Sequence, residues 1–470
     1  MLISFIIFMS CFALIGLSAA KFARKSKDDY YLAGRSVSAW LTGLSAVATN
    51  NSGYMFIGVI GYTYHSGFAA IWLMLGWIVG DIIASFYIHP HVQKQASKHN
   101  AVSVMSLVSL WQDKAHPVLR RLLAWSALIL MMSYAAAQFL AGSKALHVLL
   151  DWPIWMGVVM VAVLVAAYCF SGGIRASIWT DAAQSFVMVG AMSILLFTAI
   201  QHQGGVNSVW QQLQAVPNFM NMQPEGLFLP GWSGVLAFTF GWLVAGFSVV
   251  GQPHVMVRFI ALGGEQKMST VRVWYYVWFT VFYLMATGVG MLSRLILDNT
   301  ATFDAELALP LISVELLPDW LVGLILAGIF AATLSTADSL ILSCSAAFTQ
   351  DAFKEKILNT KLIKSATLVI TLITLLIALY AKQSVFSLVV FSWSALGCAI
   401  APLLIGFIRG WRISQTGAIF VVIISVGSSI LWRYLGLHND LYEGVVGILL
   451  GLICFALLNQ FSKREQAQQV

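Results

Sequence analysis

The stretch Thr49-Asn50-Asn51-Ser52-Gly53-Tyr54 lies in the middle of an apolar segment, residues 40–64, that is otherwise long enough to cross a bilayer. Two carboxamides, a hydroxyl and a helix-weakening glycine are costly there, because the bilayer core holds no water to satisfy polar groups. A helix broken at this depth exposes backbone carbonyls and helix ends to a small solute and a cation, as in many secondary transporters. The alternative is a continuous helix whose Asn and Ser side chains hydrogen-bond to neighbouring helices.

The composition places the chain in a membrane. Hydrophobic residues make up 59% of its 470 residues and charged residues only 10%, whereas soluble domains carry about 25% charged residues. The net charge of +7 indicates basic loops on one side of a membrane rather than a nucleic-acid partner. The cysteines lie in apolar segments without metal-ligand spacing, so we expect free, buried thiols; they are Cys11, Cys169, Cys344, Cys398 and Cys454.

Thirteen segments are apolar and long enough to cross the bilayer, which takes about 20 residues per span. They are residues 2–20, 38–62, 66–88, 121–149, 153–171, 176–201, 231–259, 272–296, 318–346, 361–381, 384–408, 413–435 and 440–461. The sequence therefore predicts an all-α polytopic membrane protein with a single transmembrane domain over residues 1–470. Residues 462–470 form the expected tail.

The basic residues predict the orientation of these spans. With the N-terminus outside, 22 of the 26 Lys and Arg residues fall in cytoplasmic segments. The outer side then keeps Lys144, Arg294, Lys382 and Arg433. Lys and Arg are concentrated in cytoplasmic loops of membrane proteins. We therefore expect a retained first span, an external N-terminus, a cytoplasmic C-terminus and a location in a bacterial type of cell membrane. Every Lys and Arg is expected at or near a surface.

Three carboxylates, those of Asp81, Asp181 and Asp338, lie inside expected spans. Ionisable groups there are rare and are candidates for function, although Asp81 could equally be a structural acid near the inner interface. Ser335, Asp338 and Ser339 share one helix face, being three and four residues apart. Their oxygens are hard ligands that suit Na⁺ rather than zinc or copper. The cluster favours ion coordination over simple close packing of small residues.

Three further features are weaker. Gly251-Gln252-Pro253-His254 should break the seventh span, because proline removes a donor and disfavours helix before it. Tyr134 and Gln138 lie one turn apart in the fourth span and could line a cavity. Arg35 precedes the second span and is either a cytoplasmic anchor or part of an inner gate.

Enzyme motifs are absent from the sequence. It contains no Gly-x-Ser-x-Gly elbow, no His-Glu-x-x-His, no Gly-Lys-Ser/Thr phosphate loop and no Cys-x-x-Cys. We therefore expect neither an enzyme nor a cofactor, and an ion gradient rather than ATP as the driving force.

Several motifs resemble those of the sodium:solute symporter family, most closely its sodium/proline branch. They are residues 28–36 (Asp-Asp-Tyr-Tyr-Leu-Ala-Gly-Arg-Ser), Leu44-Ser45-Ala46, Ser52-Gly53, Trp179-Thr180-Asp181, Gly251-Gln252-Pro253-His254 with Arg258-Phe259, and Ser335-Thr336. They occur in family order over residues 2–460. The resemblance implies sodium-coupled symport of a small organic solute, proline or a related amino acid. It also implies thirteen helices, with two five-helix inverted repeats in residues 38–408, broken helices in spans two and seven, and peripheral helices in residues 1–20 and 413–461.

The resemblance also implies a set of site residues. The sodium ligands map onto the backbone carbonyls of Ala48, Asn51 and Ala332 and the hydroxyls of Ser335 and Thr336. A second cation site, found in some relatives, maps onto Asp181, Ser335, Asp338 and Ser339. The expected substrate-binding residues are Asn50, Ser52, Gly53, Tyr54, Tyr134, Gln138, Trp242 and Gln252. Arg35 matches a family position that is important for coupling.

Two positions depart from the proline branch. That branch carries Asp where Asn50 stands, and its substrate-stacking Trp falls on Ala245, about one turn from Trp242. We hypothesise that Asp338 supplies the negative charge lost at Asn50.

Several alternatives remain open at this stage. The coupling ion could be a proton carried by Asp181 and Asp338, and the solute could be a monocarboxylate, a vitamin or a sugar. A membrane sensor is disfavoured because no cytoplasmic signalling domain occurs in the sequence. The expected partners are Na⁺, the solute and the lipid bilayer, with a monomer as the functional unit.

Overall fold

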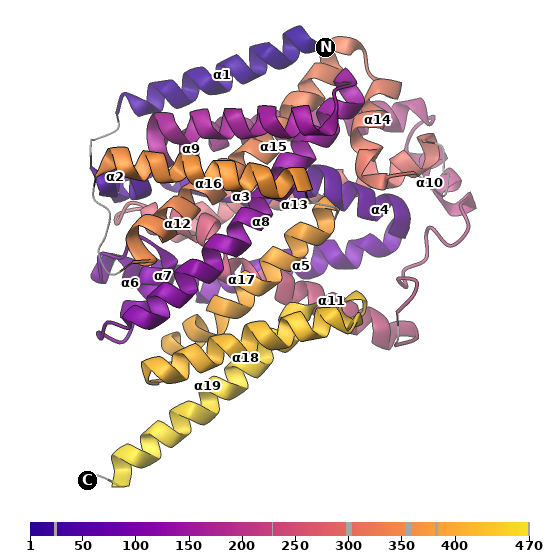
Figure 1. The fold of residues 1–470 in the computed structure, drawn as a ribbon. Coiled ribbons are helices and arrows are strands. Elements are labelled where there is room, and N and C mark those ends of the chain that lie inside the picture. Colours follow the sequence, from indigo (N-terminus) through magenta and orange to yellow (C-terminus); the bar gives the residue numbers. More distant parts are fainter. Residues whose placement is uncertain (23–25, 228, 298–302, 354–358, 381–383, 469–470) are drawn as a thin grey trace.

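The computed structural model describes residues 1–22, 26–227, 229–297, 303–353, 359–380 and 384–468, and it consists of helices and their connections (Figure 1). Within these ranges the only β-type pairing is one isolated parallel bridge between Val37 and Leu262. Some of the basic residues behind the predicted orientation lie outside the described ranges: Arg24, Lys25, Lys354, Lys356 and Lys382. Residues 469–470 of the expected tail also lie outside them.

The α-helices are α1 (Leu2–Ala20), α2 (Lys27–Leu32), α3 (Ala39–Asn50), α4 (Ile60–Ser66), α5 (Ala70–Tyr87), α6 (His89–Lys98), α7 (Val104–Leu110), α8 (Pro117–Leu150), α9 (Ile154–His202), α10 (Val206–Ala215), α11 (Gly231–Phe247), α12 (Pro253–Ala261), α13 (Met268–Ile296), α14 (Ala308–Leu316), α15 (Asp319–Ala346), α16 (Thr360–Tyr380), α17 (Val385–Ile408), α18 (Gln415–Tyr434) and α19 (Glu443–Gln468). Shorter 3₁₀ or π segments are η1 (Ala33–Arg35), η2 (Tyr54–Val59), η3 (Gly67–Ala69), η4 (Ser248–Gly251), η5 (Ala305–Leu307), η6 (Ala347–Asp351) and η7 (Leu437–Asn439).

Eleven helical stretches in the described residues are long and apolar enough to cross a membrane. The sequence predicts thirteen spans, and the difference has two sources. The second and third expected spans meet in one continuous helical stretch, Tyr54–Lys98. The expected span 153–171 supplies only a shorter apolar helix, Ile154–Cys169, within α9. The count of thirteen therefore stays a prediction.

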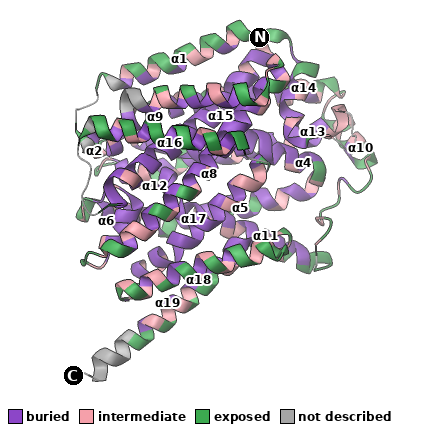
Figure 2. Cartoon of the chain, viewed as in Figure 1, coloured by how far each residue is buried: buried purple, intermediate pink, exposed green. Residues whose placement is uncertain are grey.

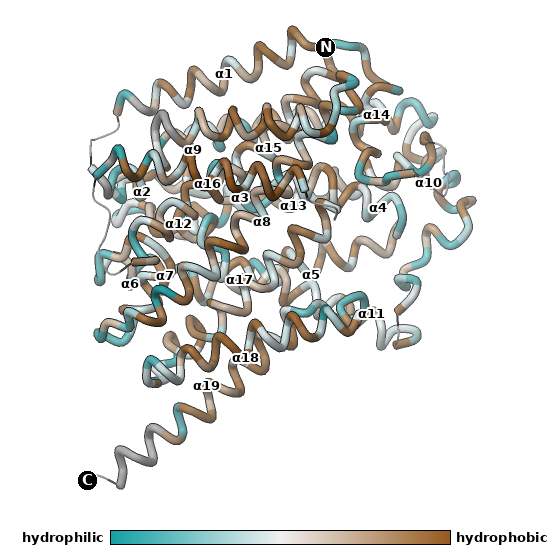
Figure 3. Tube along the Cα trace, in the orientation of Figure 1, coloured by the Kyte–Doolittle hydropathy of each residue, from teal (hydrophilic) through white to brown (hydrophobic). Residues whose placement is uncertain are grey.

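The outward-facing surface of the helices is apolar. Exposed residues lie along α1, α16 and α18 (Figure 2), and the same helices are largely brown on the hydropathy scale (Figure 3). Ile3, Leu372 and Leu431 expose 77%, 57% and 56% of their surface. Such a surface is unfavourable in water, at about 25 cal/mol per Å² of apolar area, and suits lipid.

The five cysteines are all free thiols, but they are not all buried. Cys169, Cys344 and Cys398 are buried, as expected, whereas Cys11 on α1 is exposed and Cys454 is half-buried. The expectation was wrong for these two because apolar character in a membrane helix does not distinguish a lipid-facing position from a core position.

The centre of the bundle is formed by α15 and α17. In the most apolar segment of each, 83% of the residues are buried. Helix α15 packs against α8, α9 and α3, and α17 packs against α8 and η4. Helix α1 lies at one edge of the bundle and α18 and α19 at the opposite edge (Figure 1). The polar residues of interest therefore lie on central helices, away from lipid.

Two helices are broken near the centre of the bundle. Helix α3 ends at Asn50, Asn51 has a non-helical ψ of 41°, and the chain resumes with the π-helical η2. Helix α11 and η4 end before Gln252, which is extended (φ −96°, ψ 99°), and Pro253 begins α12. Proline favours an extended residue before it and suits the first turn of a helix. The predicted breaks are confirmed, and the continuous-helix alternative is wrong.

A third interruption lies within α9, where Gly173 adopts the left-handed φ of +59°. A Cβ atom at this position would lie 2.6 Å from the backbone oxygen of Tyr30. Only glycine fits both the conformation and the close approach of α2, and the sequence analysis had placed a boundary between two spans here.

Candidate functional site

The first break is supported by side chains from α8. The backbone N–H of Gly53 donates to Gln138 Oε1 at 2.9 Å, and the Tyr134 hydroxyl donates to Ser52 Oγ at 3.2 Å. A Cβ on Gly53 would lie 2.7 Å from Thr333 Cγ2 of α15. The structure therefore brings together Ser52, Gly53, Tyr134 and Gln138. These four residues are among the substrate-binding residues predicted from the sequence.

Of the expected sodium ligands, Ala48, Ala332 and Ser335 lie together, whereas the hydroxyl of Thr336 and the side chain of Asn51 bond to other carbonyls. The Ser335 hydroxyl on α15 donates to the carbonyls of Ala48 at 3.2 Å and Ala332 at 3.1 Å. Thr336 instead donates to the Thr49 carbonyl at 2.9 Å. The side chain of Asn51 donates back to the Val47 carbonyl of its own helix at 3.0 Å. Ala48, Ala332 and Ser335 thus form one cluster of hard oxygen atoms between the broken helix and α15, which fits Na⁺.

A buried arginine lies among the residues of the expected second cation site. Arg258 of α12 is 1% exposed. Its Nη2 lies 3.3 Å from Asp181 Oδ2, and it donates to Ser177 Oγ at 3.1 Å and to Ser339 Oγ. The expectation that every Lys and Arg lies near a surface was wrong here, because a carboxylate and several hydroxyls from other helices satisfy this guanidinium inside the bundle.

The remaining members of the expected second site belong to the same network. Asp338 Oδ1 accepts hydrogen bonds from Ser177 Oγ at 3.2 Å and Ser339 Oγ at 3.0 Å. Ser339 also donates to the Ser335 carbonyl at 2.5 Å. Asp181 Oδ2 accepts from Ser45 at 2.6 Å. The predicted residues therefore do gather, but the cation among them is a side chain of the protein.

Asn50 pairs with a carboxylate that the sequence analysis did not connect to it. Its Nδ2 donates to Asp81 Oδ2 of α5 at 3.0 Å. The hydroxyls of Tyr275 and Tyr276 on α13 donate to the two oxygens of Asp81 at 2.9 Å and 2.8 Å. The acidic group in contact with Asn50 is therefore that of Asp81, whereas Asp338 lies in the network of Arg258. Sequence alone flagged Asp81 as an intramembrane acid but gave no signal for its partner.

The second break faces the first across a group of aromatic residues. Gln252 Nε2 donates to the Trp393 carbonyl of α17 at 2.9 Å. The ring of Tyr134 lies 5.3 Å from His254 and 6.4 Å from Trp393. Trp393 was missed, although its place between Ser392 and Ser394 in an apolar span was a usable signal.

Several buried polar atoms around the two breaks have no hydrogen-bond partner in the described part of the chain. They include Gln138 Nε2, Gln252 Oε1 and both ring nitrogens of His254. Buried polar groups are normally paired. These atoms are therefore available to hydrogen-bond a polar group from outside the described chain.

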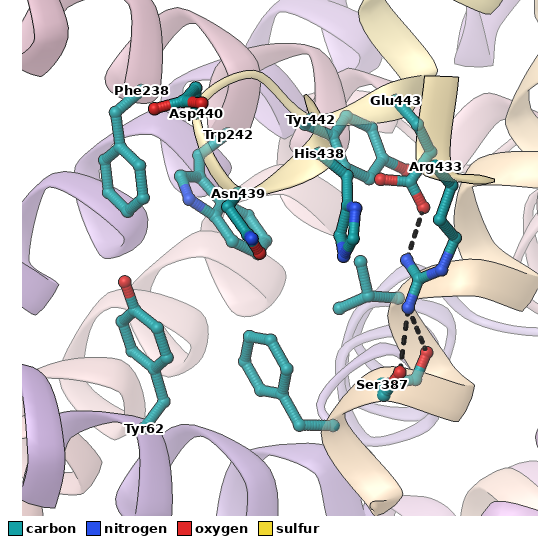
Figure 4. A pocket seen from close by; sticks show the side chains of 12 residues that line it. Tyr62, Phe238, Trp242, Ser387, Arg433, His438, Asn439, Asp440, Tyr442 and Glu443 are labelled. Carbon is teal, nitrogen blue, oxygen red and sulfur yellow. Dashed lines mark hydrogen bonds and ion pairs between the residues drawn. The ribbon is translucent and has the colours of Figure 1, made fainter. Parts of the chain in front are cut away.

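Tyr54 and Trp242 lie on an aromatic cluster beside this centre. The Trp77 ring lies 5.5 Å from Tyr54 and is stacked 5.7 Å from Trp242. Trp242 also lines a separate cavity of about 260 Å³ (Figure 4). Tyr54 and Trp242 thus lie beside the paired breaks. Asn50 is the last residue of α3 at the first break, and its side-chain amide donates to Asp81.

Arg35 joins three segments of the chain. Its guanidinium donates to the carbonyls of Ala96 at 3.2 Å, Ala101 at 2.8 Å and Ile260 at 3.3 Å. These contacts connect the start of the broken span two with the α6–α7 connection and the end of α12. A surface anchor needs no such contacts, and a role of Arg35 in the inner gate stays a prediction.

Apolar outer helices, two broken helices and an oxygen cluster between them form the architecture of a secondary transporter. The sequence pattern of the Sodium:solute symporter family matches residues 30–425. The chain belongs to this family, as its motifs predicted, and it is a multi-pass protein of the cell membrane.

Curated relatives and solved structures agree with this assignment. The chain is 26% identical to a sodium/proline symporter of Salmonella typhimurium, covering 98% of this chain and 93% of the relative. It is 25% identical to the osmoregulated proline transporter OpuE of Bacillus subtilis, covering 98% and 95%. The fold is similar to a substrate-bound, outward-open Na⁺-coupled sialic acid symporter, with a TM-score of 0.80, 20% identity and 97% coverage of both chains.

Proposed function

We propose that this protein carries proline or a related small amino acid into the cell together with Na⁺. One observation carries the proposal. The Ser335 hydroxyl joins the carbonyls of Ala48 and Ala332 beside the broken span two. The named relatives transport proline, and family membership supports sodium coupling.

Sodium binding at this cluster would hold α3 and α15 together. The Ser335 hydroxyl would rotate its hydrogen away and coordinate Na⁺ through its oxygen, together with the Ala48 and Ala332 carbonyls. The residues that follow Ala48 form the break, so the ion would also order the backbone near Gly53 and Tyr134. Ion and solute then raise each other's affinity, because the coupling free energy between two sites is reciprocal.

We infer one sodium ion per solute. Arg258 fills the position between Asp181 and Ser339 where a second cation would bind. Two positive charges cannot share that carboxylate without strong repulsion in a medium of low dielectric constant. The guanidinium therefore supplies the fixed charge that links α12, α9 and α15.

Transport would proceed by alternating access between two five-helix inverted repeats in a thirteen-span topology. The external N-terminus, the cytoplasmic C-terminus and the monomeric unit of the sequence analysis remain part of this proposal. The hydrogen bonds of Arg35 would hold the inner gate closed. They would have to break before Na⁺ and the solute are released into the cell.

Uptake by purified protein in proteoliposomes tests the proposal directly. Radiolabelled proline should accumulate when external Na⁺ is present and should not accumulate when choline replaces it at fixed pH. Accumulation driven by a proton gradient in choline would support the proton-coupled alternative instead. A thermal-shift screen of amino acids, monocarboxylates and sugars, with and without Na⁺, would identify a different solute.

A further inference from the structure

A cavity of about 260 Å³ lies between α4, α11, α17 and the α18–α19 connection (Figure 4). It is separate from the paired breaks but close to them, because its wall residue Trp242 stacks on Trp77, which contacts Tyr54. The residues that matter for its chemistry are Tyr62, Trp242, Phe386, Arg433, Asp440 and Glu443.

The cation of this cavity is held in place by groups of the protein. Arg433 Nη1 donates to Glu443 Oε1 at 2.7 Å, and Nη2 donates to Ser387 Oγ at 2.8 Å and to the Ser387 carbonyl at 3.5 Å. These contacts use three of the five N–H donors of a guanidinium. Its side chain is 19% exposed while Glu443 is 2% exposed. Arg433 is therefore fixed by a buried partner and keeps donors for a ligand.

Aromatic rings form the apolar wall of the cavity. Tyr62 and Phe386 are stacked at 5.3 Å with an interplanar angle of 7°, and Trp242 meets Phe386 edge-on at 6.2 Å. Figure 4 shows Asp440 at the upper left of the view, beside Phe238 and above Trp242, and Arg433 at the right. The lining of the cavity thus includes a cation, aromatic rings and an anion.

We propose that this cavity is a capture site for a zwitterionic amino acid with an apolar body, which binds here before it reaches the broken helices. Its carboxylate binds Arg433, its apolar part lies against Trp242 and Phe386, and its ammonium group faces Asp440. The inference rests on the proposed function and on the orientation that places Arg433 outside the cell. Neither a bare monocarboxylate nor a sugar would use all three parts of the site.

The test compares wild type with a double variant that removes one positive and one negative charge and so leaves the net charge unchanged. Arg433→Gln alone leaves Glu443 buried without its partner and is expected to fold poorly. The double variant Arg433→Gln/Glu443→Gln removes both charges together. It should unfold at the wild-type temperature, yet its KM for sodium-driven proline uptake in proteoliposomes should rise by about tenfold or more, the effect of losing a charge-assisted hydrogen bond. The maximal rate should change little.

Two further measurements separate recognition from a structural or general charge effect. Cyclopentanecarboxylate and pyrrolidine each keep one charged group of proline, and both should compete with wild-type uptake more weakly than proline does. Arg294→Gln removes a positive charge that lies over Tyr64 and lines a neighbouring cavity, and its KM should stay at the wild-type value.

Each contrary result has a distinct meaning. A folded double variant with wild-type KM would overturn the capture site and leave the symport proposal intact. An equal rise of KM in Arg294→Gln would also overturn it, because surface charge alone would then explain the effect. If wild type took up no zwitterionic amino acid with Na⁺, both proposals would fall.

Discussion

The guanidinium of Arg258 and the carboxylate of Asp181 lie 3.3 Å apart inside the bundle, with side chains that are 1% and 0% exposed. The two residues come from α12 and α9, and their hydroxyl partners come from α3, α9 and α15. A buried pair of this kind is strongly destabilising when one partner is removed, because the other charge then remains uncompensated.

The single variants of this pair should therefore be unstable and the double variant should not. We expect Arg258→Gln to lower the free energy of unfolding by about 3–5 kcal/mol. Arg258→Gln/Asp181→Asn should recover most of that loss in a thermal unfolding assay in detergent. Arg412→Gln, which changes an exposed arginine, serves as the control. Equal stability of Arg258→Gln and wild type would contradict the buried pair.

The number of sodium ions bound per transport cycle provides a second test of the role of Arg258. If Arg258 replaces a second cation, the Hill coefficient for Na⁺ activation of wild-type uptake should be about 1. In Arg258→Gln, the freed carboxylate of Asp181 would accept Na⁺, so Na⁺ should restore part of the lost thermal stability while choline should not. A wild-type Hill coefficient near 2 would refute the single-ion proposal.

Ser335→Ala tests the proposed sodium cluster. Loss of the hydroxyl removes one ligand and the link between the Ala48 and Ala332 carbonyls, so the Na⁺ concentration for half-maximal uptake should rise by about tenfold or more. Ser429→Ala is the matched control, because this buried serine of α18 donates to the Val426 carbonyl of its own helix and lies outside the sodium cluster. Similar Na⁺ activation curves for the two variants would exclude Ser335 as a ligand.

Two carboxylate variants decide which acid compensates for Asn50. The sequence hypothesis predicts that Asp338→Asn sharply weakens sodium dependence. The contact between Asp81 and Asn50 predicts that Asp81→Asn does so, and by more. Sodium activation of uptake by both variants, normalised to the amount of folded protein, ranks the two effects. A larger effect of Asp338→Asn would favour the sequence hypothesis.

The binding of proline at the capture site should not depend on pH in neutral to slightly alkaline solution. Burial, and then the nearby charge of Arg433, lower the pKa of His438 below its usual value, against the opposing effect of Glu443. His438 therefore gains its positive charge at a lower pH than an unperturbed histidine, whose pKa is about 6.5. We expect a constant KM for proline between about pH 7.5 and 8.5. A KM that changes in this range, and is constant again in His438→Gln, would contradict the assignment of a neutral His438.

The sequence predicted the two breaks because their causes are local. Pro253 fixes the conformation of Gln252 from one residue away, and the polar run from Thr49 to Tyr54 is short enough to recognise in any apolar segment. The proximity of Ser52, Tyr134 and Gln138 was predicted from the family resemblance.

The pairings between distant helices were not predictable in this way. Arg258 counts as a cytoplasmic charge by its position near the end of a span, and only the fold shows that it enters the bundle. Asn50 and Asp81 are 31 residues apart, and no periodicity within one helix relates them. Trp242 was placed at the substrate by its spacing from a motif, whereas helix packing places it in the neighbouring cavity.

The permanent attachment of Arg258 to the chain also limits how far the protein can concentrate its cargo. A cation that stays in the protein does no work against a gradient, so under the proposed one-ion stoichiometry the driving force per cycle comes from one ion. For a neutral zwitterion, a tenfold sodium gradient contributes about 1.4 kcal/mol and a membrane potential of about 100 mV contributes about 2.3 kcal/mol. Their sum allows an accumulation of roughly 500-fold, whereas a second travelling ion would square that ratio.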